Sequence, residues 1–131
     1  MKKTVFLLFA ISLMAFTLSA QENQNAKTDS IIFQKMVHDY GTITQGADGN
    51  CEFTFINKGK EPLVLNNVRA SCGCTVPTWP REPIQPGEKG VIKVKYNTAR
   101  IGNFNKSVTV NSNAVNSTVV LRIKGNVTPK Q

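Results

Sequence analysis

Apolar and polar residues alternate along most of the chain beyond residue 30. The pattern is clearest in 51–55, 92–96, 104–110 and 119–124, where apolar residues recur at alternate positions. Successive side chains of a strand point to opposite faces, so a period of two predicts strands with one buried face. A helical period of 3.6 residues is absent beyond residue 20. The pattern therefore predicts an all-β protein.

Turn-forming residues divide these segments into short strands. The first strand is predicted to begin at 31–33 and to continue through 40–43, and another runs from Leu63 to Val68. Turns are predicted where Gly and Asn are concentrated, at 46–49, 57–60, 102–103 and 111–113. About seven strands with turns at short intervals predict a Greek-key β-sandwich.

Prolines at positions 77, 80, 83 and 86 are three residues apart, which matches the polyproline II repeat. The segment is either a proline-rich ligand for another protein module or a stiff connection that ends in a Pro86-Gly87 turn. We favour the connection. Since proline cannot donate to a sheet ladder, we also expect the segment to cover a sheet edge. We expect Trp79 to lie close to the cysteines that precede it.

Residues 1–20 have the pattern of a secretory signal peptide. Lys2 and Lys3 are followed by an apolar run from 5 to 18, and Ala20 is a small residue at the cleavage position. The run is shorter than the ~20 residues that a membrane-spanning helix needs. We therefore predict a secreted or periplasmic protein with a flexible leader at 21–30, one β-sandwich domain at 31–127 and a tail at 128–131.

The chain is basic, with 16 Lys and Arg against 8 Asp and Glu and a formal net charge of +8. The charges are scattered over alternating strand positions and turns, which indicates solvated faces. Attraction to anionic surfaces or polymers outside the cell is the alternative. No basic stripe with interleaved aromatic residues is present, so nucleic acid is not an expected partner. We expect no membrane-spanning segment, and the oligomeric state is left open.

Two of the three cysteines, Cys72 and Cys74, flank Gly73 in the sequence S-C-G-C-T at 71–75. On a strand both side chains would face the same way, and around a turn at Gly73 they would converge. Three arrangements are open: a local disulfide that is readily reduced, two thiolates that hold a soft metal such as Cu(I), or two partly buried thiols that pack.

The third cysteine, Cys51, shares a strand face with Phe53 and Phe55. We therefore predict that it is a buried core residue. A tetrahedral zinc site has four ligands, so Cys72 and Cys74 would need further ones, and His38, Met36 and Cys51 would all have to come close.

Combinations of residues typical of enzymes are nearly absent. The chain has one histidine, His38, and its neighbour Asp39 would point to the opposite face of a strand. The sequence has no close pair of carboxylates, no phosphate-binding loop and no nucleophile elbow. We predict that the protein is not an enzyme and needs no cofactor, with copper or zinc at the cysteine pair as the alternative.

A series of short motifs resembles the secreted bacterial domain-of-unknown-function family numbered fifteen seventy-three. The family is similar to the immunoglobulin-like domains of the PapD chaperone and the major sperm protein. The resemblance implies an immunoglobulin-like sandwich and export, and it implies no reaction. It covers about residues 31–127 and rests on 40–43 with Gly46, Asn57 with Gly59, 62–63, 71–75, 83–84 with 86–88, Gly102 with Phe104 and Lys106, and Gly125.

Taken together, the sequence predicts a secreted, non-enzymatic binding module that takes a protein partner through an open sheet edge. We expect the cysteine pair to control whether the adjoining edge is open, because it fixes how the proline segment leaves the preceding strand. The alternative function is a soft-metal or thiol-redox site at Cys72 and Cys74.

Overall fold

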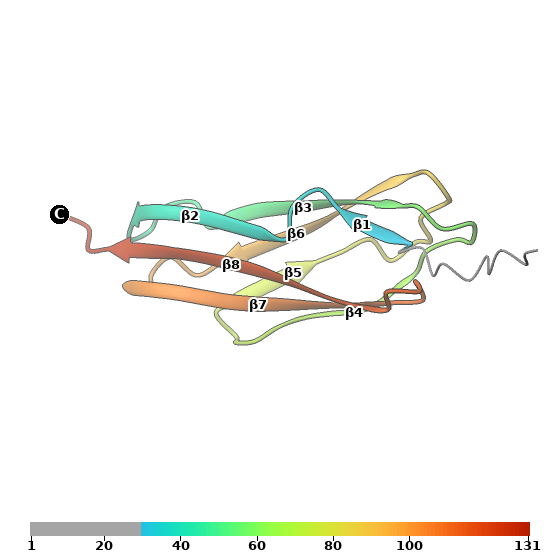
Figure 1. Ribbon diagram of the computed structural model, residues 1–131. Helices are drawn as coiled ribbons and strands as arrows, with labels where there is room; N and C mark the ends of the chain where they lie inside the picture. Colours follow the sequence, from blue (N-terminus) through green and yellow to red (C-terminus); the bar gives the residue numbers. More distant parts are fainter. Residues whose placement is uncertain (1–29) are drawn as a thin grey trace, which may run out of the picture.

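The structure, a computed structural model, describes residues 30–131 as two four-stranded β-sheets packed face to face (Figure 1). The predicted signal peptide and nearly all of the predicted leader lie outside the described residues. The strands are β1 (Ile31–Phe33), β2 (Val37–Thr44), β3 (Asn50–Asn57), β4 (Leu65–Ala70), β5 (Thr75–Thr78), β6 (Lys89–Tyr96), β7 (Gly102–Ser112) and β8 (Thr118–Thr128). The predicted all-β, immunoglobulin-like sandwich is confirmed, with eight strands in place of about seven.

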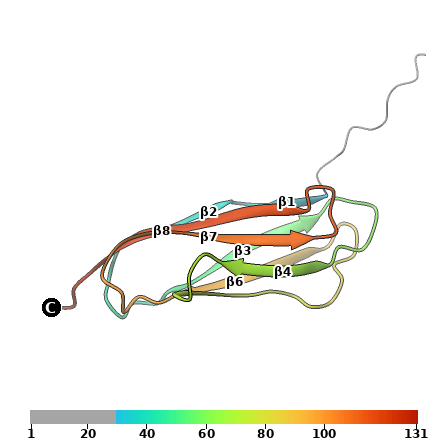
Figure 2. The same cartoon turned by 90° about the horizontal axis from the view of Figure 1, so that it is seen from below.

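The first sheet has the strand order β1-β3-β6-β5 and the second has the order β2-β8-β7-β4. Figure 2 shows β8, β7 and β4 of the second sheet side by side. All neighbouring strands are antiparallel except β2 and β8, which are parallel. Among the described residues, no helix is long or apolar enough to span a membrane.

The core lies between the sheets and is formed by the alternate apolar positions of each strand. Phe53 and Phe55 of β3, Ile92 of β6 and Leu121 of β8 have no exposed surface. Residues between them, such as Lys93, are exposed. The period of two in the sequence therefore selected the correct buried face of these strands.

The predicted first strand is two strands that lie in different sheets. β1 pairs with β3 in the first sheet, and β2 pairs with β8 in the second. Residues 34–36 connect them, with the Gln34 N–H bonded to Thr54 O and the Arg122 N–H bonded to Met36 O. The prediction of one strand was wrong because the alternation of apolar and polar residues does not indicate which sheet a strand joins.

Two of the predicted turns are also wrong. Gly102 and Asn103 begin β7, and Asn111 and Ser112 end it, so the turns lie at 97–101 and 113–117. The β7–β8 hairpin extends its pairing from Gly102 opposite Val127 to Asn111 opposite Thr118. Residues typical of turns therefore occupy strand positions because the long cross-strand ladder overrides local preference.

The proline segment was partly predicted. Its start forms edge strand β5, which the sequence did not indicate, and Ile84 makes an isolated antiparallel bridge with Leu63. The predicted turn at Pro86-Gly87 is confirmed: Glu88 N–H bonds to Gln85 O, and Gly87 has a φ of 82°. Glycine suits the third position of such a turn because it adopts positive φ without strain.

Candidate functional site

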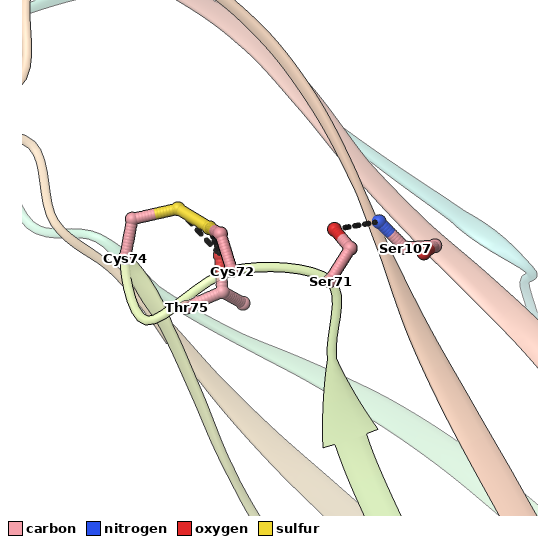
Figure 3. The surroundings of a disulfide bond; sticks show 5 residues. All are labelled: Ser71, Cys72, Cys74, Thr75 and Ser107. Carbon is pink, nitrogen blue, oxygen red and sulfur yellow. Dashed lines mark hydrogen bonds between the residues drawn. A yellow bond between two sulfur atoms is a disulfide. The ribbon is translucent and has the colours of Figure 1, made fainter.

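The motif at 71–75 carries the chain from one sheet to the other at the side of the sandwich. β4 is the edge of the second sheet and β5 is the edge of the first, and residues 71–74 connect them. Ser71 ends β4: its N–H donates to Ser107 O at 2.9 Å, and its Oγ accepts from the Ser107 N–H at 3.2 Å (Figure 3). The Ser71 hydroxyl therefore accepts the hydrogen bond that the Ser71 backbone C=O would accept if β4 continued.

Cys72 and Cys74 form a disulfide within this crossing (Figure 3). Their Cα atoms are 5.3 Å apart, inside the usual range for disulfides of about 4.4–6.8 Å. Cys72 is half-buried, whereas Cys74 is buried with 5% of its surface exposed. Of the three arrangements that the sequence left open, the structure has the local disulfide.

Two of the other predicted metal ligands, Met36 and His38, do not lie near the pair. Met36 and His38 are at the β2 edge of the second sheet, three strand positions from β4 in the order β2-β8-β7-β4. At about 4.8 Å for each strand spacing, this is a separation of roughly 14 Å. Residues 30–131 contain no group of three His, Cys, Asp or Glu side chains placed to hold a metal ion. A soft-metal site at Cys72 and Cys74 stays a prediction, and it requires the reduced pair.

Thr75 is a site residue that sequence reasoning missed. Its side chain is 3% exposed, and its Oγ1 lies 3.7 Å from Cys72 Sγ and 3.6 Å from Cys74 Sγ. Its backbone N–H also donates to Cys72 O, which closes the turn around Gly73. The sequence signal was the threonine directly after the second cysteine, but only the fold shows that its hydroxyl faces the sulfurs.

The disulfide closes a very small loop, so it constrains the unfolded chain weakly. In the chain-entropy model a loop of three residues contributes about 1.6 kcal/mol of stability, against about 4.7 kcal/mol for a loop of a hundred. Cys72 and Cys74 are two positions apart in sequence. The bond therefore fixes the local path of the crossing more than it stabilises the whole domain.

Cys51 is a free, buried cysteine with 7% of its surface exposed, as predicted. Burial raises the pKa of its thiol, and a hydrogen bond with Tyr40 opposes that shift only in part. Burial, followed by the contact with Cys51, also raises the pKa of Tyr40. The Tyr40 hydroxyl donates to Gly49 O at 2.7 Å. Cys51 is therefore a neutral core residue.

Trp79 does not lie beside the cysteine pair. β5 is extended between Thr75 and Thr78, so five residues place Trp79 about 16 Å along the chain from Cys74. The indole packs against the core, with the Arg81 guanidinium carbon 3.8 Å from the ring centroid. Trp79 therefore reports on the far end of the β5 segment, not on the disulfide.

A cleft of about 350 Å³ lies away from the disulfide, between residues 57–63 and residues 113–115. It is organised by Asn57, which is 1% exposed. The Asn57 side-chain amide donates to Glu61 O and Ile84 O, and its carbonyl accepts from the Gly59 N–H. Since these bonds use both amide hydrogens and the carbonyl oxygen of Asn57, it is a structural residue of the loop and not a free ligand group.

The four outer strands differ in how open their free edges are. β1 has only three residues. β2 has a register break between Asp39 and Thr42, where the Asp39 carboxylate accepts from the Gly41 N–H at 2.8 Å. β5 has four residues and includes Pro77. These are the ordinary ways in which proteins blunt sheet edges.

β4 lacks those features over its last residues. Ser71 and Ser107 form a hydrogen-bonded pair, so the alternation of an antiparallel ladder makes Arg69 a bonded position too. The N–H and C=O groups of Val68 and Ala70 then point away from β7. Register is regular from Asn67 to Ala70, after a break at the start of the strand. The outer edge of β4 next to the disulfide is therefore more regular than the outer edges of β1, β2 and β5.

The two packed sheets, and the connections through which the chain passes between them, define an immunoglobulin-like β-sandwich of the PapD-like type. The chain belongs to the family described as "Protein of unknown function (DUF1573)", whose model matches residues 31–127. No functionally curated protein matches the chain by sequence. The family assignment agrees with the resemblance in the motifs of the sequence.

Solved structures share the fold at low sequence identity. A protein of unknown function from Porphyromonas gingivalis W83 superimposes with a TM-score of 0.66 and 16% identity, over 77% of this chain and 48% of that one. The PapD-like domain 7 of human CEP192 gives 0.59 and 9%, over 78% and 87%. The YadV chaperone gives 0.52 and 16%, over 78% and 53%. The chain spans about half the length of the Porphyromonas protein.

Proposed function

We propose that this protein is a secreted, non-enzymatic binding module that takes an extended segment of a protein partner at the free edge of β4. The observation that carries the proposal is the edge itself. The backbone groups of Val68 and Ala70 point away from β7, and added strands bind such groups through main-chain hydrogen bonds. The similarity to a chaperone supports a protein partner, although at 16% identity it concerns the fold alone.

The side chains around this edge suggest the chemistry of the partner. Asn66, Asn67 and Arg69 are exposed on β4, and the chain carries a net charge of +8. No carboxylate lies on β4, so Arg69 is available to pair with one. A neutral or acidic extended segment fits better than a basic one, because like charges across neighbouring strands are destabilising.

The edge proposal is tested by replacing Ala70 with proline. Ala70→Pro removes the outward N–H but keeps the ladder to β7, since proline is tolerated at an edge position whose N–H faces solvent. Ala70→Val is the matched control, because it adds similar volume and keeps the N–H. A photo-crosslinking residue at the exposed position 67 should trap a partner in the exported fraction. The adduct should persist with Ala70→Val and disappear with Ala70→Pro.

The same experiment gives a result that would refute edge binding. If the adduct forms equally in both variants while circular dichroism shows that both are folded, the partner does not bind through the β4 edge. Amide exchange sharpens the outcome: Val68 and Ala70 should exchange quickly in the free protein and slowly in the complex.

Export is the second part of the proposal, and it is supported by the basic, apolar and small-residue pattern of residues 1–20. Mass spectrometry of the native, non-reduced protein from the producing cell should find a chain that begins at Gln21. A chain recovered from the cytoplasm with residues 1–20 intact would contradict export. The same spectrum reports whether Cys72 and Cys74 are oxidised, free or metal-bound.

A further inference from the structure

The two cysteine residues of the disulfide differ in exposure. Cys74 is buried, with 5% of its surface exposed, whereas Cys72 is half-buried at the outer side of the crossing. Gly73 between them is exposed, and a Cβ atom placed there would meet nothing within 4 Å. A thiolate must reach the sulfur that it attacks, and access decides which sulfur that is. Solvent therefore has a route to Cys72 past an open loop.

The buried side of the disulfide carries a hydrogen-bond donor for a leaving sulfur. Thr75 Oγ1 is 3.6 Å from Cys74 Sγ, and the threonine side chain is 3% exposed (Figure 3). Among the described residues, the hydrogen bonds of this hydroxyl are those with the two sulfurs. A hydrogen bond to an ionised acceptor is stronger than one to a neutral acceptor, so the hydroxyl stabilises a thiolate more than it stabilises the disulfide.

We propose that the Cys72–Cys74 disulfide is a thiol-exchange site in which Cys72 accepts an external thiol and Cys74 leaves. The incoming thiolate sulfur uses a lone pair to form a bond to Cys72 Sγ. The Cys72–Cys74 bond breaks, and its electron pair stays on Cys74 Sγ as a thiolate that the Thr75 hydroxyl binds. The external thiol is thereby oxidised to a mixed disulfide, and Cys74 is reduced.

The ligand class of this site is a thiol outside the cell, either a small molecule or a cysteine on a flexible protein segment. Cys51 does not take part, because it is a free, buried thiol on β3 and has no disulfide bond that an external thiol could exchange with. The site is independent of strand addition at β4, since exchange needs an accessible Cys72 sulfur and not an open backbone edge. Thiol exchange gives the motif at 71–75 a chemical role in addition to holding the path of the chain between the two sheets.

The test uses the oxidised mature chain, residues 21–131, incubated with glutathione in one arm and with a cysteine-containing peptide in the other. The reaction is quenched with acid after short times, and fragment mass spectra of the peptide covering 70–81 locate the adduct. The adduct should be on Cys72, with Cys74 free. Faster reaction in one arm identifies the source of the thiol. Equal labelling of both cysteines, or labelling mainly at Cys74, would overturn the assignment.

Two single variants remove the complication that an adduct can migrate between neighbouring sulfurs. Cys74→Ser leaves Cys72 as the free thiol, and Cys72→Ser leaves Cys74. An aromatic disulfide reagent should react with Cys72 in the first variant at least about tenfold faster than with Cys74 in the second, because reaction follows access. Equal rates in the two folded variants would reject the asymmetry.

The role of Thr75 is tested by Thr75→Val, which removes the hydroxyl at similar volume. Exchange with glutathione should slow at least about tenfold, the effect expected for one lost hydrogen bond to a charged group. Thr75→Ser should restore the rate because it retains the hydroxyl. Thr78→Val, at an exposed position of the same strand, should change nothing. If folded Thr75→Val exchanges at the wild-type rate, the hydroxyl does not bind the leaving sulfur.

Discussion

Two connections join an edge strand of one sheet to an edge strand of the other: residues 34–36 join β1 to β2 at one side of the sandwich (the first crossing), and residues 71–74 join β4 to β5 at the other side (the second crossing). At the first crossing β1 and β2 run in the same direction, so the chain behaves as one bent strand (Figure 1). At the second crossing β4 leads into β5 and the chain reverses direction (Figure 1). The two crossings therefore place different demands on the chain.

Backbone hydrogen bonds to the neighbouring strands accompany the first crossing. Gln34 N–H donates to Thr54 O and Met36 O accepts from the Arg122 N–H, so both ends are tied to a neighbouring ladder. At the second crossing Ser71 and Cys74 are also tied to ladders, but the turn between them is closed by the disulfide and by Thr75. A bent strand is held by the backbone hydrogen bonds to its neighbouring strands. A reversal between sheets has no such bonds within the turn, so side chains hold it.

The largest effect should come from the first crossing, because burial of β1 against the core holds it. Ile31 is 2% exposed and Ile32 is 40% exposed. Ile31→Ala should lower the free energy of unfolding by about 2–4 kcal/mol, from lost burial and the cavity left behind. Ile32→Ala should change it by less than about 0.5 kcal/mol. Urea unfolding measures both variants. Similar losses from the two would show that packing of β1 does not hold this side.

The next effect concerns the disulfide at the second crossing. Cys72→Ser/Cys74→Ser should lower the free energy of unfolding by about 1.6 kcal/mol, the loop-closure contribution of a three-residue loop. Hydrogen exchange should quicken most at residues 68–76, and at residues 31–44 by no more than the global loss of stability explains. A loss above about 4 kcal/mol, or an equal increase of exchange on both sides of the sandwich, would show that the disulfide supports the whole fold and not this crossing alone.

The smallest effect is a pH dependence at the first crossing. Burial and the Lys35 ammonium lower the pKa of His38 from its ordinary value of 6.5, and Lys35 Nζ lies 2.8 Å from His38 Nδ1. Below pH 6.5 the unfolded chain binds more protons at His38 than the folded chain does. His38 therefore favours the folded state above pH 6.5, and this contribution is lost as the pH falls through the lowered pKa.

The measurement is urea unfolding of the wild type and of His38→Gln between pH 5 and pH 8. The wild type should lose slightly more stability toward the acid end than His38→Gln does. The disulfide does not titrate, so Cys72→Ser/Cys74→Ser should retain the wild-type slope. If His38→Gln has the same pH profile as the wild type, titration at the first crossing is not linked to folding.

Most of the strands and their buried faces could be predicted from the sequence alone, because they depend on a period of two within each segment. The positions of Phe53, Ile92 and Leu121 in the core could be predicted in this way, as could the burial of Cys51. The family could also be predicted, because its short motifs occur in order along the chain. Export, too, remains a prediction from residues 1–20.

Features that depend on pairing between distant segments could not be predicted from the sequence. The strand with which a segment pairs sets the sheet that it joins, and the predicted strand at 31–43 is therefore divided into β1 and β2. Pairing with β6 likewise places Pro77 in edge strand β5. The same holds for the candidate site. The sequence placed Cys72 and Cys74 within reach of each other but left three arrangements open. The inward position of Thr75, and the difference in burial between the two cysteines, arise only when β4 and β5 join different sheets.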